Sequence, residues 1–301
     1  MKKSFKQSRA ASFAAIFIVY LLAAAVGIVV YYFLPLFWNF AIKLLVADVI
    51  ATVFTFVFSA ALKNASVYDP YWSVQPIVIA TAYFIHTGYS LSGLFPLIAI
   101  CLWGVRLTAN WAYTFKDLTH QDWRYTLLKE KTGKLYPFVN FTGIHMIPTF
   151  IVYACTLPAA TVITLKPAFN VFSLIFFGVS LFAILLQAVA DLQMQTYRLN
   201  RTTPFIGTGL WKHARHPNYL GEILMWWGIG GYCVLSMPDK WYLIVGALLN
   251  TVLFLTVSIP MADERQSAKD GFKEYKARTR ILFPIPKRSA KSDTETVESA
   301  G

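Results

Sequence analysis

A short segment around residue 215 concentrates the side chains that could do chemistry. From Gly207 to Gly228 the sequence reads GTGLWKHARHPNYLGEILMWWG. Four cationic or hydrogen-bonding groups fall within five positions of it: Lys212, His213, Arg215 and His216. An arginine offers a planar fork of donors that suits phosphate oxygens. The segment therefore indicates a site for an anion, such as a phosphate or a carboxylate.

The residues that follow favour a built ligand site over a simple basic patch. Pro217 suits the first turn of a helix, whose N-terminus presents free N–H groups and the positive end of its dipole. Asn218 and Glu222 are four positions apart and share a helix face, and Tyr219 stands in the same turn. Attraction to anionic lipid headgroups would not require this interleaving. The two histidines of the segment have no carboxylate-rich helix of matching spacing, so we expect no metal site.

Further ionisable residues lie where apolar stretches end. Arg106, Asp191 and Glu222 fall at the inner ends of three separate stretches. A charge in hydrocarbon costs several kcal/mol unless it is paired or hydrated. Three such groups at one depth indicate a ligand pocket open to the cytosol, and interhelical ion pairing is the alternative. Asp48 also lies within an apolar stretch, and the sequence shows no evident partner for it.

The elements that must position these residues are membrane-spanning helices. The chain has 301 residues, of which 56% are hydrophobic and 14% charged, whereas a soluble domain carries about 25% charged residues. This composition excludes a disordered chain, a coiled coil and an ordinary water-soluble enzyme. We predict an all-α, polytopic transmembrane bundle of about eight spans, seven being possible. The windows are residues 13–34, 39–62, 74–92, 94–113, 143–165, 169–190, 219–236 and 241–260.

The formal net charge of +12 predicts how this bundle is oriented. With the N-terminus inside, all but four of the 27 Lys and Arg residues lie on the inner side. The exceptions are Lys43, Lys166 and Lys240 on the outer side and Arg106 within a span. Such an asymmetry predicts that both termini are cytosolic. We therefore read the positive charge as a topology signal, with membrane lipids and no nucleic acid as partners.

The chain is expected to divide into a cytosolic N-terminus, one transmembrane domain and a disordered tail, over residues 1–12, 13–286 and 287–301. Residues 187–286 would form the cofactor-binding part of the domain. From Ala262 to about Arg278 the pattern predicts one cytosolic amphipathic helix lying on the inner membrane surface, with Phe272 and Tyr275 on one side. A bacterial inner membrane is expected, or the endoplasmic reticulum in a eukaryotic source.

Longer strings resemble a known family. WKHARHPNYLGEILMWWG, followed by Glu264-Arg265 and then YKARTRILFPIP, resembles the C-terminal superfamily of the steroid 5α-reductases, and more narrowly its DUF1295 branch. The earlier strings DPYWSVQP, LWGVRLTANWAYTF and QDWRYTLLKEKTGK are similar to that branch too. The resemblance covers roughly residues 65 to 286.

The resemblance implies an NADPH-dependent reductase of a conjugated C=C bond. Its substrate would be a lipophilic, steroid- or lipid-like molecule that enters from the bilayer. Arg198 is the expected contact of the adenosine phosphate. From the motif and the resemblance together, the residues expected to bind the cofactor are Arg106, Asn110, Gln187, Asp191, Arg198, Lys212, Arg215, His216, Asn218, Tyr219, Glu222, Arg265 and Tyr275.

The substrate side departs from the family pattern. Steroid reductases hold the enone ketone with a Tyr three residues before the arginine of the fourth span, and with a Glu on an earlier helix. Here the first position is Trp103, and no Glu precedes Glu130. The nearest polar set is in DPYWS, so either Asp69 or Tyr71 is expected to take the catalytic acid role, or the substrate is not a 3-keto steroid.

Two other classes of function remain open. Isoprenylcysteine and phospholipid methyltransferases share the R-H-P-x-Y-x-G core and use it for S-adenosylmethionine, so a methyltransferase with that cofactor is the first alternative. A non-enzymatic transporter or lipid-binding protein is the second. The lack of paired broken helices with midplane charges, Asp48 apart, argues against a transporter. The sequence does not predict the oligomeric state.

Overall fold

The computed structural model describes residues 5–287, which are helical and contain no β-strand. Eight helices carry the bundle: α1 Arg9–Phe33, α2 Phe40–Leu62, α3 Tyr71–Thr87, α4 Leu91–Thr114, α7 Ile147–Leu165, α8 Leu174–Leu199, α9 Pro217–Ser236 and α10 Val245–Leu253. Four shorter helices lie at one end of it: α5 Trp123–Thr132, α6 Tyr136–Val139, α11 Ile259–Ser267 and α12 Phe272–Arg278. Residues 288–301, most of the expected disordered tail, lie outside the described residues.

Six helical segments among the described residues are long and apolar enough to cross a membrane. They are Arg9–Phe33, Phe40–Leu62, Leu91–Thr114, Trp123–Leu165, Val171–Leu199 and Pro238–Ser267. The expectation of an all-helical, multi-pass membrane protein is confirmed. The two remaining windows also fall on helices, α3 and α9. Neither helix is among the six segments long and apolar enough to cross, α3 having only 17 residues, so the count of eight crossings stays a prediction.

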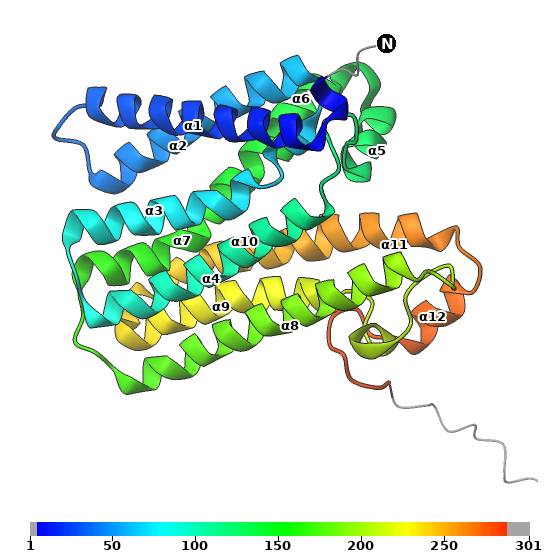
Figure 1. The fold of residues 1–301 in the computed structure, drawn as a ribbon. Coiled ribbons are helices and arrows are strands. Elements are labelled where there is room, and N and C mark those ends of the chain that lie inside the picture. The colour runs from blue at the N-terminus through cyan, green and yellow to red at the C-terminus, as the bar shows by residue number, and fades with distance from the viewer. Residues whose placement is uncertain (1–4, 288–301) are drawn as a thin grey trace, which may run out of the picture.

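The helices form successive layers, which Figure 1 shows from the side. The α1–α2 hairpin covers one side, α3 packs beneath it against α4 and α7, and the α8–α9 pair forms the opposite side. The main apolar core lies between α3, α4, α7, α8 and α9, around the fully buried indoles of Trp103 and Trp226. The bundle thus separates an N-terminal part, α1–α3, from a C-terminal part built on α8 and α9.

Polar segments gather at one end of the bundle, which we call the inner end. The start of α1, helix α5, the loop of residues 200–216 and helix α12 all lie there in Figure 1, whereas the α1–α2, α3–α4 and α7–α8 turns lie at the other end. This segregation fits the expected placement of both termini on one side. Which side of a membrane the inner end faces stays a prediction.

The α8–α9 contact is the most extensive in the molecule, and glycines make it possible. A Cβ atom at Gly221 would lie 2.7 Å from the Ala183 carbonyl oxygen of α8, and one at Gly228 would lie 2.1 Å from Ser180 Oγ. Neither distance is allowed for a side chain, so glycine lets the two backbones approach closely. This contact fixes the spacing of the polar residues that the two helices present to each other.

Two features of the elements matter for the site, and one of them corrects a prediction. Helix α8 continues past the predicted membrane window of residues 169–190 to Leu199, so Asp191 and Arg198 both lie on it. The tail is not one amphipathic helix on the membrane surface. It breaks between α11 and α12 at Gly271, whose φ of 75° suits glycine. The rings of Phe272 and Tyr275 are buried and pack on Phe205 instead of facing lipid.

Candidate functional site

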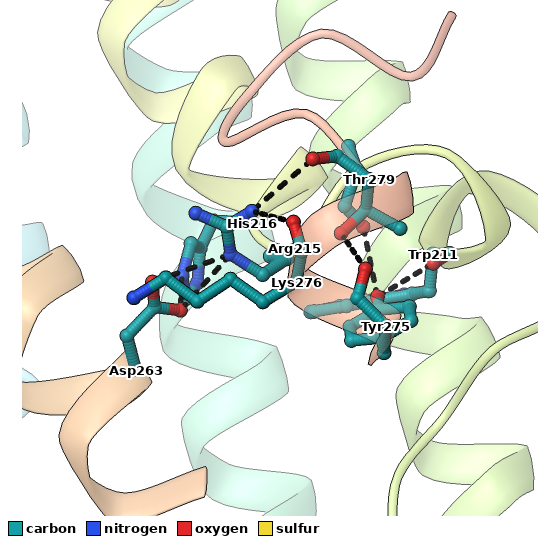
Figure 2. A network of polar contacts seen from close by, with 8 residues as sticks. Trp211, Arg215, His216, Asp263, Tyr275, Lys276 and Thr279 are labelled. Carbon is teal, nitrogen blue, oxygen red and sulfur yellow. Dashed lines mark hydrogen bonds and ion pairs between the residues drawn. The ribbon is translucent and has the colours of Figure 1, made fainter. Parts of the chain in front are cut away.

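The cationic residues that precede α9 form a closed network with the C-terminal helices. Both carboxylate oxygens of Asp263, on α11, lie 3.2 Å from Arg215 Nε. Its Oδ1 also lies 3.0 Å from His216 Nε2. Lys276 Nζ, on α12, lies 3.3 Å from Asp263 Oδ2. Figure 2 shows these groups converging on one carboxylate. Except for the partly exposed lysine, the paired side chains are more than 90% buried. We call this set, Arg215, His216, Asp263 and Lys276, the latch.

Backbone and side-chain hydrogen bonds extend the latch on both sides. Arg215 and His216 donate backbone N–H groups to the carbonyls of Arg280 and Ile281, each at 3.0 Å. The Arg215 guanidinium donates to the Thr279 carbonyl at 3.2 Å. The hydroxyl of Tyr275 donates to the Trp211 carbonyl at 2.6 Å, as Figure 2 shows. The latch therefore fastens the loop before α9 to the end of the chain, and its donors face protein acceptors.

A second polar group lies between α4, α8 and α9. Arg106 Nη1 donates to Asp191 Oδ2 at 2.7 Å, and Asn218 Nδ2 donates to the other oxygen at 3.4 Å. One turn further along α8, Gln195 donates to the side-chain carbonyl of Asn110. These five residues form what we call the inner cluster. The structure thus brings together Arg106, Asn110, Asp191 and Asn218, all of which the sequence nominated for the cofactor.

The inner cluster is not saturated by protein partners. Arg106 Nε, Arg106 Nη2 and Asn218 Oδ1 are buried and find no hydrogen-bond partner within residues 5–287. The same is true of Gln187 Oε1 on the neighbouring turn of α8. Unpaired buried donors and acceptors are costly and uncommon in folded proteins. Unpaired donors and acceptors thus lie close together where α4, α8 and α9 meet.

Glu222 lies one turn deeper on α9 and is almost fully buried. Its Oε2 accepts from Trp103 Nε1 at 2.8 Å and from Gln187 Nε2 at 2.9 Å, and its Oε1 accepts from Trp226 Nε1 at 2.9 Å. Gln187 and Asp191 stand four positions apart on α8. Across the helix contact, Gln187 bonds to Glu222 and Asp191 to Asn218, which also stand four positions apart on α9. The pairing explains why both helices carry polar residues at this spacing. It also gives the carboxylate three protein donors.

Four basic side chains lie near one another at the inner end, and Arg198 among them lies near Asp191 of the inner cluster. We call Arg198, Arg201, Arg265 and Lys269 the basic rim. The charge of Arg198 acts on both Asp191 and Arg265. Burial, together with the charges of Arg201 and Arg265, lowers the pKa of Lys269. Like charges held this close repel one another, and a polyphosphate would relieve the repulsion. The guanidinium of Arg265 also stacks 4.4 Å from the centre of the Trp123 ring.

The other nominated residues lie around these groups. The ring of Tyr219 stacks on His216 of the latch, with centroids 5.1 Å apart. Tyr275 belongs to the latch region, where its hydroxyl is taken by backbone carbonyls. Lys212 is exposed on the loop and contributes to neither network. The cofactor roles of all these residues stay predictions.

An apolar cavity of about 760 Å³ lies between α1, α2 and α3. Asp48, Tyr71 and Gln75 are its polar group, set among apolar lining residues. Tyr71 Oη donates to Asp48 Oδ1 at 3.0 Å, and the Gln75 amide donates to Asp48 Oδ2. Asp48 therefore has two partners, which the sequence did not reveal. A cavity of this size suits a lipophilic small molecule.

The structure separates the two residues expected to act as the acid. Tyr71 lines the cavity, whereas Asp69 does not. Asp69 instead accepts from Tyr125 Oη of α5 at 2.5 Å, and burial raises its pKa to about 7. The α3 segment nevertheless connects the cavity to the C-terminal half. The Trp72 ring lies 6.1 Å from the ring of Trp103, which donates to Glu222.

Sequence reasoning missed four residues that complete these sites: Asp48 as a paired group, Gln75, Gln195 and Asp263. A signal existed for two of them. Gln75 stands four positions after Tyr71, and Gln195 four positions after Asp191, so each shares a helix face with a nominated residue. Asp263 and Asp48 gave no such signal, because their partners come from distant parts of the chain.

Comparisons with known proteins agree with the sequence resemblance. The model of the family described as "Protein of unknown function (DUF1295)" matches residues 55–279. An uncharacterized protein of Schizosaccharomyces pombe is 26% identical over 62% of this chain. The match spans 62% of that relative's length. No solved structure matches the chain. The family match includes the inner cluster, the latch and the α3 wall of the cavity.

Proposed function

The chain belongs to the DUF1295 family, which is related to the steroid 5α-reductases, and from this premise we propose that it is a membrane-embedded NADPH-dependent reductase. The reaction would be the reduction of a conjugated C=C bond in a lipophilic substrate. The observation that carries the proposal is the pairing of an unsaturated polar cluster at the inner end with an apolar cavity that contains a hydrogen-bonded tyrosine.

The residues present fit a phosphorylated dinucleotide. The free donors of Arg106 and the free acceptors of Asn218 and Gln187 match amide and hydroxyl groups of such a ligand. The basic rim supplies positive charge for its phosphates, and Arg198, which lies close enough to act on Asp191, is the residue we assign to the adenosine phosphate. Trp123, whose ring contacts Arg265, would offer a ring face beside the basic rim. NADPH bound there would supply the hydride.

The chain's own residues would prepare the substrate. Tyr71 Oη would donate a hydrogen bond to the carbonyl oxygen conjugated with the double bond and so stabilise the negative charge that develops there. Asp48, whose Oδ1 lies 3.0 Å from Tyr71 Oη, would hold the phenol in position beside the substrate carbonyl. The apolar walls of α1, α2 and α3 would exclude water from the reacting carbons.

Ligand-dependent thermal stability of the purified protein tests the cofactor. We expect NADPH to raise the melting temperature and S-adenosylmethionine to leave it unchanged. A steroid enone should then be consumed together with NADPH. Stabilisation by S-adenosylmethionine alone would favour the methyltransferase, and stabilisation by neither would favour a non-enzymatic protein.

Membrane topology belongs to the same proposal. Eight crossings with both termini in the cytosol would put the inner cluster and the basic rim on the side where NADPH is present, in a bacterial inner membrane or the endoplasmic reticulum. The gathering of polar segments at the inner end supports it. Labelling of single cysteines placed at residues 7 and 287 should occur only from the cytosolic side.

A further inference from the structure

A second, smaller cavity lies at the inner end of the bundle, where the end of α2 meets α5 and α6. We call it the α2–α5 pocket. Its volume is about 230 Å³, and its wall is mostly polar. None of its lining residues belongs to the latch, the inner cluster or the basic rim. Cavities that enclose a drug-sized ligand measure about 300–1,000 Å³. The α2–α5 pocket therefore suits a smaller polar group.

Two lysines give the α2–α5 pocket a positive charge. Lys63 follows the last residue of α2, Lys129 lies on α5, and both line the pocket. Neither ammonium group has an ion-pair partner among residues 5–287. The Lys129 ammonium lies 6.0 Å from the centre of the Tyr136 ring, which also lines the pocket. Two unpaired cations at one small cavity favour an anionic ligand, such as a phosphate group.

A buried acceptor belongs to the same wall. Asn140 lines the α2–α5 pocket and is 6% exposed, and its Oδ1 has no hydrogen-bond partner among residues 5–287. Other polar groups of the wall are used within the protein. Ser59 Oγ donates to the Asn64 carbonyl, and Gln121 Oε1 accepts from a backbone N–H group. A side-chain carbonyl oxygen can only accept a hydrogen bond. The ligand that completes this pocket therefore carries a donor, such as a hydroxyl group, beside its anion.

The backbone at Asn140 is irregular. Helix α6 gives way there to a π-helical segment, Asn140–Met146. The ring nitrogen Nδ1 of His145 lies 3.0 Å from the Asn140 carbonyl oxygen, within the same segment. Segments of π-helix are rare and occur frequently at functional sites. This irregular turn sets the position of Asn140 in the pocket wall.

Exposed apolar side chains beside the α2–α5 pocket indicate where its ligand comes from. Leu135 and Phe138 flank the lining residues Tyr136 and Pro137, and each is 68% exposed. Exposed apolar side chains next to lysines are typical of a membrane boundary, where acyl chains and headgroups meet. A phospholipid would contact both kinds of residue, whereas a free phosphate ester would gain nothing from the apolar ones.

We propose that the α2–α5 pocket binds the headgroup of an anionic phospholipid that carries hydroxyl groups, such as phosphatidylglycerol. Lys63 and Lys129 contact the phosphate, and a headgroup hydroxyl donates to Asn140 Oδ1. The acyl chains lie along Leu135 and Phe138 at the surface. The site goes beyond the proposed reductase and does not depend on it.

Four matched probes test the proposal on the full-length protein in a neutral detergent. Three are dioctanoyl lipids: phosphatidylglycerol, phosphatidylmethanol, which keeps the negative charge but has no hydroxyl, and phosphatidylcholine, which is neutral overall. The fourth is glycerol phosphate, which has no acyl chains. Native mass spectrometry measures the affinities. Phosphatidylglycerol should bind about tenfold more tightly than phosphatidylcholine and about threefold more tightly than phosphatidylmethanol. An excess of glycerol phosphate should not displace it.

Single variants assign the contacts. Lys63→Met and Lys129→Met should each weaken phosphatidylglycerol binding about fivefold. The matched control is Lys134→Met, which removes one exposed positive charge near α6 from outside the pocket lining and should change the affinity less than about twofold. Asn140→Leu has a similar volume but no acceptor, so it should bind phosphatidylglycerol and phosphatidylmethanol equally. The comparison of these two lipids on the unmodified protein tests the same contact without a substitution.

Three results would each overturn the inference. Equal affinity of the unmodified protein for phosphatidylglycerol and phosphatidylcholine would show that the lysines select no anion. Displacement of the lipid by glycerol phosphate would make a free phosphate ester the ligand. An equal loss of affinity in Lys134→Met and in the two pocket variants would reduce the effect to general surface charge.

Discussion

The latch and the inner cluster meet in the short segment from Arg215 to Asn218, yet they differ in how their polar groups are used. In the latch, the Asp263 carboxylate contacts Arg215, His216 and Lys276, and Arg215 Nη1 donates to backbone carbonyls of α12 and the residue after it. In the inner cluster, Arg106 and Asn218 have buried atoms without a hydrogen-bond partner among residues 5–287. A network whose groups are all paired holds a fold together, whereas unpaired buried groups can still accept water or a ligand as a partner. The boundary between them falls within one turn, between His216 and Asn218.

The largest effect should come from a substitution that breaks the latch, and it should be a loss of stability. Asp263→Ala leaves a buried guanidinium and a buried imidazole without their shared partner, which should cost about 3–5 kcal/mol of stability. We expect a marked fall in the melting temperature of the detergent-solubilised protein. The matched control is Glu264→Ala on the same helix, whose pair with Lys131 is exposed and worth about 1 kcal/mol or less. Similar melting temperatures for the two variants would contradict the structural role of the latch.

Substitutions in the inner cluster should change the affinity for NADPH more than the stability of the fold. Arg106→Met removes the free donors, and we expect the dissociation constant for NADPH to rise about 10- to 100-fold, as for the loss of charged hydrogen bonds. Isothermal titration measures it. The variant also leaves Asp191 unpaired, so the control is Arg106→Met combined with Asp191→Asn. If the double variant binds NADPH normally, Arg106 serves only to neutralise Asp191.

A substitution of Glu222 tests whether the polar groups of α9 beyond Asn218 are fully paired within the protein. Glu222 sits on the face of the inner cluster, but its three hydrogen bonds all come from protein donors. In Glu222→Gln a new N–H group must face one of these donors, which should cost about 1–3 kcal/mol of stability. Thermal unfolding reports this loss. An unchanged melting temperature would show that the carboxylate is not held as the geometry indicates.

The smallest effect should appear at the basic rim. Arg198 is exposed, so Arg198→Ala should leave stability unchanged and weaken NADPH binding by several-fold, about 1 kcal/mol. NADH lacks the phosphate on the 2′ oxygen of the adenosine ribose, so the affinity of the variant for NADH should equal that of the unmodified protein. Parallel titrations of the variant with NADH and NADPH show whether Arg198 contacts the phosphate that only NADPH carries. Equal losses for NADH and NADPH would place Arg198 elsewhere along the dinucleotide.

The motif around Arg215 shows how far sequence reasoning reaches. Residue types and the i, i+4 spacing placed Asn218 and Glu222 on one helix face, and the structure confirms that placement through their contacts with α8. The same reasoning could not assign Arg215, because a guanidinium suits a phosphate and a carboxylate equally well. Asp263, which it meets, lies 48 positions further along the chain. Only packing of α11 against the loop reveals the choice.

Composition and local spacing by themselves determined that this is a multi-pass helical membrane protein and which residues deserved attention. Hydrophobic stretches must be helical in a bilayer, because every backbone polar group has to be satisfied within the segment. Tertiary structure alone decided which polar groups are saturated and which stay open. It paired Asp48 with Tyr71 and closed α8 on α9 through glycine. Those outcomes depend on contacts between distant segments, and helical periodicity carries no information about them.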